Sequence, residues 1–193
     1  MSQHPRLAEL TALLADHRAA LLAVVDTVPA AARERRPPTA ADAWSVAEVL
    51  DHLAKVEGGT ARLLARRIAR ARESGVGADE GEDSVRDRMD RFDVAGGKVR
   101  RTAPELVAPQ AGVAAADALA ALAASREALL ATIRDADGVD LTQVYATHGA
   151  FGELDGYQWL LFVGQHEARH TRQIAAVRDA LAGGGEPGDS ATG

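Results

Sequence analysis

The chain has 193 residues and no cysteine, which excludes disulfides, thiolate metal ligands and a cysteine nucleophile. Its 28 acidic and 22 basic residues give a formal net charge of −6, which argues against nucleic acid as the main partner. Residues 1–9 lack the basic start and apolar run of a signal peptide, and no stretch has the roughly 18 apolar residues of a membrane span. We therefore expect a single soluble, cytoplasmic domain with no membrane partner.

The first helix is predicted over residues 6–28 by apolar side chains that recur at steps of three and four. This stripe comprises Leu7, Leu10, Leu14, His17, Leu21, Val24 and Val28. Proline cannot continue a helix, so Pro29, Pro37 and Pro38 predict a loop that extends to Trp44.

The second helix is predicted to begin at Ser45, because Ser45 and Glu48 have the spacing of a capping box. Its apolar side carries Val46, Val49, Leu53, Val56, Leu63, Leu64 and Ile68, and the helix should end near Gly75. The same helix carries an arginine stripe of Arg62, Arg66, Arg67, Arg70 and Arg72. We interpret this stripe as a solvated helix face; an anion-binding patch, or a nucleic-acid-binding module, is the weaker alternative.

The middle of the chain is less regular. Glycines and acids over residues 77–83 predict a loop, residues 84–92 a short charged helix, and residues 96–112, with two prolines, an irregular segment. A third helix follows, since apolar residues recur with helical spacing up to Gly138. These residues are Leu119, Leu122, Leu129, Leu130 and Ile133.

The last helix is predicted from about Asp155 to the glycines at 183–185. Its apolar face contains Trp159, Phe162, Val163, His166, His170, Gln173, Ile174, Val177 and Leu181. Four long amphipathic helices without a convincing strand pattern predict an all-α four-helix bundle over residues 1–182. The glycine-rich residues 183–193 are expected to form a disordered tail.

Two histidines interrupt the apolar face of this last helix. His166 and His170 stand four residues apart, so their Cβ atoms lie roughly 6 Å apart on one face and can bridge a metal ion. Burying two imidazoles is costly unless their nitrogens are satisfied. His52, at the edge of the core stripe of the second helix, is the best candidate for a third ligand. Three imidazoles leave a coordination position open, as in catalytic sites, and suit zinc or nickel.

The segments Trp44–Leu53 and His166–Ile174 resemble the DinB-like (YfiT-like) superfamily. The resemblance implies a four-helix bundle in which one histidine of the second helix and an H-x-x-x-H pair of the fourth bind a divalent metal. The family's His-Pro-x-Phe-Gly element reads His148-Gly149-Ala150-Phe151-Gly152 here, with glycine in place of proline. Characterised relatives include thiol-dependent transferases and isomerases, among them the mycothiol-dependent maleylpyruvate isomerase.

This resemblance leads to two functional hypotheses. The first is a metal-dependent enzyme that activates a small thiol, as a transferase, or water, as a hydrolase, and acts on a small-molecule substrate. Because the chain lacks cysteine, a low-molecular-weight thiol would have to be a cosubstrate. The second is a metal-binding or stress-associated protein without turnover. Relatives often pair through helix faces, which implies a homodimer.

Five further residues are weaker candidates for the site. Glu48 can act as a base beside His52, although a capping role is favoured, and His148 can lie at the mouth of the cavity, although a structural loop role is favoured. Gln173 can bond a metal ligand, a substrate or the backbone. Arg126 can meet a substrate carboxylate, but a buried acid or a route to solvent is favoured. For His17 a buried, hydrogen-bonded role is favoured over that of a fourth ligand.

Overall fold

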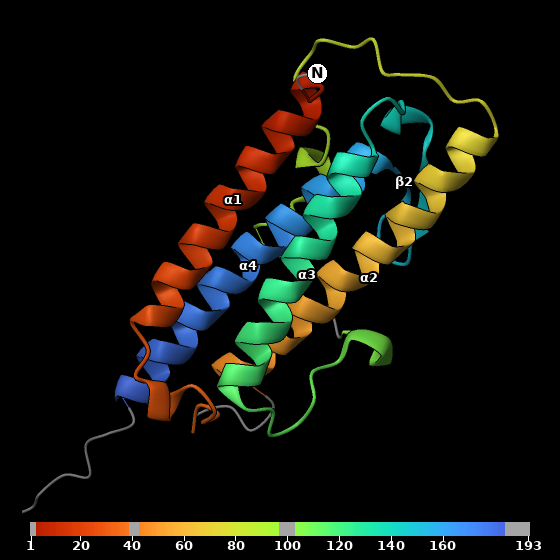
Figure 1. The fold of residues 1–193 in the computed structure, drawn as a ribbon. Helices are drawn as coiled ribbons and strands as arrows, with labels where there is room; N and C mark the ends of the chain where they lie inside the picture. The colour runs from red at the N-terminus through yellow and green to blue at the C-terminus, as the bar shows by residue number, and fades with distance from the viewer. Residues whose placement is uncertain (1–2, 39–42, 97–102, 184–193) are drawn as a thin grey trace, which may run out of the picture.

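Four long helices dominate the computed structural model, which describes residues 3–38, 43–96 and 103–183. They are α1 (Pro5–Asp26), α2 (Val46–Glu73), α3 (Ala115–Asp135) and α4 (Gly156–Gly183). Figure 1 shows α1 and α4 running in one direction and α2 and α3 in the other. The closest packing joins parallel neighbours, α2 with α3 and α1 with α4, which explains the long connection between α2 and α3. The predicted all-α four-helix bundle is confirmed.

The ends of the helices agree with the sequence-based boundaries to within about a turn. The capping box predicted at the start of α2 is present: the Glu48 amide donates to Ser45 Oγ over 3.2 Å, and the Ser45 amide donates to Glu48 Oε2 over 2.8 Å. The predicted disordered tail, apart from Gly183, lies outside the described residues. No helix in the described part of the chain is long and apolar enough to cross a bilayer.

A short antiparallel hairpin between α3 and α4 corrects the expectation of a plain loop there. Strand β1 (Tyr145–His148) pairs with β2 (Gly152–Asp155), with Tyr145 opposite Asp155 and His148 opposite Gly152. Gly152 has a φ of 76°, a backbone conformation that favours glycine. Strands of four residues are too short to show a clear apolar alternation, so the sequence pattern did not reveal them.

The remaining connections contain single turns of 3-10 helix. Those in the long α2–α3 connection are η2 (Asp90–Phe92) and η3 (Glu105–Val107). The charged helix expected over residues 84–92 is therefore reduced to η2, preceded by hydrogen-bonded turns. Two others are η1 (Ala30–Ala32), after α1, and η4 (Leu141–Gln143), before the hairpin.

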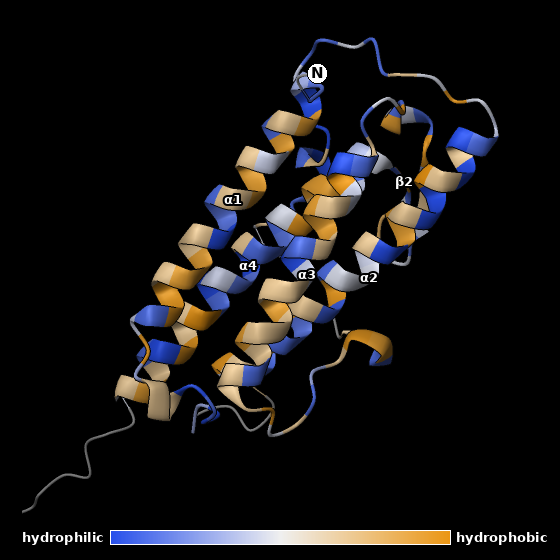
Figure 2. Ribbon diagram, viewed as in Figure 1, coloured by the Kyte–Doolittle hydropathy of each residue, from blue (hydrophilic) through white to orange (hydrophobic). Residues whose placement is uncertain are grey.

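The core consists of two apolar clusters, one toward each end of the bundle. The cluster near the start of α1 contains Leu14, Ala61, Leu129 and Val163, and the cluster near the end of α1 contains Leu21, Ala54, Leu122 and Ile174. Figure 2 shows hydrophobic and hydrophilic residues in alternating bands along each helix. Each helix thus passes from one apolar cluster to the other, and the candidate site lies at the level where the two clusters meet.

Candidate metal centre

The side chains of His52, His166 and His170 meet between α2 and α4. The Nε2 atom of His166 lies 3.4 Å from Nε2 of His52 and 3.1 Å from Nε2 of His170. One ligand atom from each histidine lies within 4.8 Å of the other two. Nitrogens bonded to one tetrahedral zinc ion at about 2.05 Å would be about 3.3 Å apart. The three rings therefore converge at a spacing compatible with a single metal ion.

The hydrogen bonds of the outer ring nitrogens show that a cation fits this cluster. His52 Nδ1 donates to the carbonyl oxygen of Val107 over 2.7 Å, and His170 Nδ1 donates to Gln173 Oε1 over 2.7 Å. In a neutral imidazole the second nitrogen then carries a lone pair. Nε2 of His166 carries at most one hydrogen, which it can donate to Nε2 of only one neighbour, His52 or His170. In the other pair the two nitrogen lone pairs face each other. A metal ion held by His52, His166 and His170 would relieve that repulsion.

All three histidines are held in the neutral form that metal ligands require. Burial lowers the pKa of His52. Burial also lowers the pKa of His170, to about 3, with His52 as a further cause. The pKa of His166 lies well below its usual value, because of burial and then because of its two histidine neighbours. The cluster therefore does not compete for protons near neutral pH.

A segment around η3 holds His52 from the side opposite α4. Besides the Val107 carbonyl, the Gln110 amide donates to Asp51 Oδ2 over 2.7 Å, and Lys55 Nζ donates to the Ala108 carbonyl over 2.9 Å. Asp51 and Lys55 also form an ion pair of 2.8 Å. In Figure 2 η3 is a hydrophobic turn beside α2. Outer contacts of this kind fix the orientation and tautomer of a ligating imidazole.

Aromatic rings border the histidines. The Trp44 ring lies 5.0 Å from His52 and stacks near His170 at 6.4 Å. The Phe162 ring stacks against His166 at 5.2 Å. The histidine cluster is therefore flanked by one aromatic ring from the residue before the cap of α2 and one from α4.

The two candidates for acid–base chemistry lie outside the cluster. Glu48 uses its carboxylate in the capping box and in an ion pair with Arg36 at 2.5 Å. His148 ends β1, where its Nδ1 accepts the Ala150 amide over 3.0 Å and its ring packs 4.6 Å from Phe162. Both positions are compatible with the favoured structural interpretations, and a role of either residue at the metal stays a prediction.

His17 and the arginine stripe are not members of the three-histidine cluster. His17 is half-buried on α1 and faces α4, where a Cβ added at Gly164 would lie 3.0 Å from its ring. Its pKa is lowered by burial, which the nearby Glu167 carboxylate partly offsets. Arg62, Arg66, Arg67, Arg70 and Arg72 are exposed, as expected of a solvated face.

Arg126 belongs to a closed ring of four charged side chains, three buried and one partly buried, that the sequence analysis missed. Its Nε contacts Glu57 at 2.5 Å and its terminal nitrogen contacts Glu167 at 2.8 Å. Arg18 completes the ring, with contacts of 2.8 Å to Glu57 and 2.5 Å to Glu167. Two buried acids thus hold the guanidinium group of Arg126, in agreement with the buried acid that was one of its two favoured partners, and a role toward a substrate carboxylate stays a prediction. We call these four residues the charge ring.

A pattern in the sequence could have revealed the charge ring. Each member takes a position in a core stripe: Arg18 lies four residues after Leu14, Arg126 four after Leu122, Glu57 four after Leu53 and Glu167 four after Val163. The helices thus contribute one charge each, two positive and two negative, and the sum is zero. Unpaired buried charges are expensive, so one charge in each stripe indicates mutual pairing.

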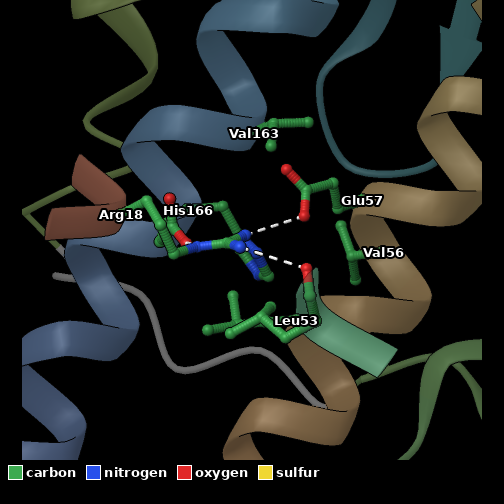
Figure 3. A pocket seen from close by; sticks show the side chains of 8 residues that line it. Arg18, Leu53, Val56, Glu57, Val163 and His166 are labelled. Atoms are coloured by element: carbon green, nitrogen blue, oxygen red, sulfur yellow. Dashed lines mark hydrogen bonds and ion pairs between the residues drawn. The ribbon is translucent and has the colours of Figure 1, made fainter. Parts of the chain in front are cut away.

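A small cavity lies between the charge ring and the histidine cluster. Its lining comprises His166, three ring members and the apolar residues Leu53, Val56, Leu122 and Val163. Figure 3 shows the guanidinium group of Arg18 bonded to the Glu57 carboxylate at this cavity, with His166 beside Arg18. Its volume is about 10 Å³, which is room for about one water molecule.

Fold and site together define a four-helix-bundle protein with a three-histidine cluster suited to a divalent metal. The sequence-family model of the DinB superfamily matches residues 13–174 of this chain, a range that contains His52, His166 and His170. The chain belongs to the DinB superfamily, which confirms the resemblance.

Two further comparisons agree with this membership. The uncharacterized protein YuaE of Bacillus subtilis (strain 168) is 28% identical over 142 residues, which cover 73% of this chain and 81% of YuaE. The crystal structure of TT2238, a four-helix bundle protein, has a TM-score of 0.57 and 24% identity, covering 88% of this chain and 98% of that chain. The likeness to TT2238 concerns the fold.

Proposed function

We propose that this protein binds one divalent metal ion through His52, His166 and His170 and is a metal-dependent enzyme acting on a small molecule. The observation that carries the proposal is the convergence of three neutral imidazoles whose Nε2 atoms lie 3.1 and 3.4 Å apart around His166. Nitrogen ligands of this kind favour zinc or nickel. Three protein ligands leave a position for a further ligand, as in catalytic metal sites.

A divalent ion in such a site supplies Lewis acidity, which lowers the pKa of a coordinated thiol or water toward neutrality. The chain's own residues have supporting tasks. Val107 and Gln173 orient two imidazoles, and Trp44 and Phe162 shield the cluster from bulk water. Because the chain contains no cysteine, a thiol nucleophile would be a low-molecular-weight cosubstrate. Thiol transfer and hydrolysis are thus the two reactions to test.

A non-catalytic metal-binding or stress-associated role is the second candidate, and one observation favours it. Glu48 and His148, the two acid–base candidates, are engaged in a helix cap and in an aromatic cluster. Turnover would therefore depend on the metal and the substrate for proton transfer. The two candidates share the metal site and differ in whether a reaction follows.

The test begins with metal analysis of protein purified without a polyhistidine tag, followed by titration with zinc, nickel and manganese. We expect one equivalent per chain, and at a free metal concentration of 100 times Kd the free energy of unfolding should rise by about 2.7 kcal/mol. His166→Ala should abolish binding. The matched control is His4→Asn, because His4 caps α1 away from the cluster and asparagine can also cap a helix.

Activity is then measured with small thiols and an electrophile such as monochlorobimane, and with ester substrates. Adduct formation or hydrolysis that needs metal and disappears in His166→Ala supports the enzyme. Metal binding without any turnover favours the non-catalytic candidate. Absence of binding in the wild-type protein would refute both.

A further inference from the structure

The charge ring separates the two apolar clusters of the core at the same level on every helix. On α1, Arg18 lies between Leu14 of one cluster and Leu21 of the other, and on α4, Glu167 lies between Val163 and Ile174. Glu57 and Arg126 occupy the corresponding positions on α2 and α3. A helix that slid by one turn would carry its charge into an apolar cluster, where it would have no partner.

The ring connects the two helices that carry the histidines. Both carboxylates come from these helices, Glu57 from α2 and Glu167 from α4, and the exposed fraction of each side chain is 3%. Two carboxylates repel each other, so contact between α2 and α4 at this level depends on the guanidinium groups supplied by α1 and α3. Arg18 and Arg126 each contact both carboxylates, which closes the ring.

Further hydrogen bonds fix the ring to the backbone. Arg18 donates to the Leu122 carbonyl over 3.0 Å, and Arg126 donates to the Leu14 carbonyl over 2.5 Å. Ser125 Oγ donates to Glu57 Oε2 over 2.6 Å. Each arginine therefore binds the backbone of the neighbouring helix as well as the carboxylates, and the ring determines how α1 and α3 lie against each other.

The ring is adjacent to the histidine cluster. Glu167 directly follows His166 and precedes His170 by three residues, while Glu57 follows His52 by five residues, or about 7.5 Å of helix. His166, Glu57 and Glu167 line one cavity. A rotation or shift of α4 that broke the ion pairs of Glu167 would also move both histidines of α4.

We propose that the charge ring is a positioning device for the three-histidine cluster, which holds α2 and α4 in the register that brings His52 to His166 and His170. Buried ion pairs add little net stability compared with well-packed apolar residues, and their attested use is to specify one register. The ring therefore determines where the imidazoles meet, and Arg18, Glu57, Arg126 and Glu167 are positioning residues. This inference rests on the proposed metal site.

The test compares two ring variants with wild-type protein after loading with cobalt(II), whose visible absorption reports coordination number and geometry. In the first, Arg18→Met, Glu57→Met, Arg126→Met and Glu167→Met are combined, which removes every ring charge at once. The second is Glu167→Gln alone, which keeps the side-chain shape. We expect both to bind cobalt at least tenfold more weakly than wild type and with altered absorption bands, as with other residues that support metal ligands.

A control of comparable destabilisation is the double variant Arg6→Met, Asp79→Asn, which breaks a partly buried ion pair of 2.8 Å remote from the three-histidine cluster. It should retain the wild-type cobalt spectrum and affinity even if its melting temperature falls. A ring variant that is folded by circular dichroism and binds cobalt as wild type does would overturn the inference. If the fourfold variant does not fold, Glu167→Gln decides by the same criterion. Failure of the wild-type protein to bind cobalt would instead refute the proposed metal site.

Discussion

Gln173 accepts a hydrogen bond of 2.7 Å from Nδ1 of His170, one turn earlier on α4. This contact turns Nε2 of His170 toward His166, 3.1 Å away. Gln173→Leu keeps the size of the side chain but removes the acceptor. We expect metal affinity to fall about 10- to 100-fold, measured by competition with a chelating dye. Gln143→Leu, at an exposed glutamine outside the bundle core, should leave the affinity unchanged; equal affinities of the two variants would contradict the prediction.

Asp51 fastens the η3 segment to α2 beside His52. Asp51→Ala removes the acceptor for the Gln110 amide and the partner of Lys55, so the Val107 carbonyl should no longer be held at His52. We expect faster hydrogen exchange at the Gln110 amide together with weaker metal binding. Asp16→Ala, at an exposed position of α1, is the control and should change neither. Unchanged exchange at Gln110 would show that the segment is held by other contacts.

Ser45 begins α2 through the capping box with Glu48. Ser45→Ala should lower the free energy of unfolding by about 1 kcal/mol, measured by urea denaturation, because the Glu48 amide loses its acceptor. Ser74→Ala, at the other end of the same helix, should have a much smaller effect. The cobalt spectrum should be the same in both variants. A changed spectrum with unchanged stability would point instead to a direct role of this helix end at the metal.

Asp79 gives the structure a defined pH dependence. Burial alone would raise its pKa, but hydrogen bonds from Tyr157, the Gly81 amide and Arg6 outweigh burial and hold the pKa below its usual value. A carboxylate with a lowered pKa stabilises the fold above its unfolded-state pKa of about 3.9, and this stabilisation is lost as the pH falls through the folded-state value.

Asp79→Asn should therefore lower the free energy of unfolding by about 1.5–3 kcal/mol at neutral pH, since bonds to a charged group are lost. The difference from wild type should shrink as the pH is lowered below about 4, because Asp79 in the unfolded wild-type chain then takes up a proton while the folded carboxylate stays ionised to lower pH. Urea denaturation from pH 7 to pH 3 measures the difference. Asp87→Asn, at an exposed position of the same connection, should show a small difference throughout. A difference for Asp79→Asn that does not vary with pH would contradict the assignment.

Local patterns were sufficient to predict much of this protein. The four helices follow from apolar stripes, and the start of α2 follows from Ser45 and Glu48, because such signals lie within a few residues of one another. The i,i+4 spacing of His166 and His170 placed them on one face of α4 for the same reason. The hairpin was missed, since four-residue strands carry too little periodic signal and are stabilised by pairing that no single strand reveals.

The approach of His52 to His166 is a tertiary fact. The sequence placed His52 at the edge of a core stripe, and the resemblance to the DinB superfamily pointed to it, but the 3.4 Å between the two Nε2 atoms depends on how α2 packs against α4. The hydrogen bond from His52 to the Val107 carbonyl likewise joins residues 55 positions apart. Such contacts depend on the path of the connection after α2, and no short sequence pattern specifies that path.

The sequence by itself determined the helices, their buried faces and the histidine pair, because these depend on spacing along one helix. It also contained one charge in each of the four core stripes, but which charges pair with one another is visible only in the packed bundle. Tertiary structure decided that Arg18, Glu57, Arg126 and Glu167 form a ring beside the histidines. The physical reason is that burying any one of these charges alone is unfavourable, so only the packed arrangement of all four helices determines their partners.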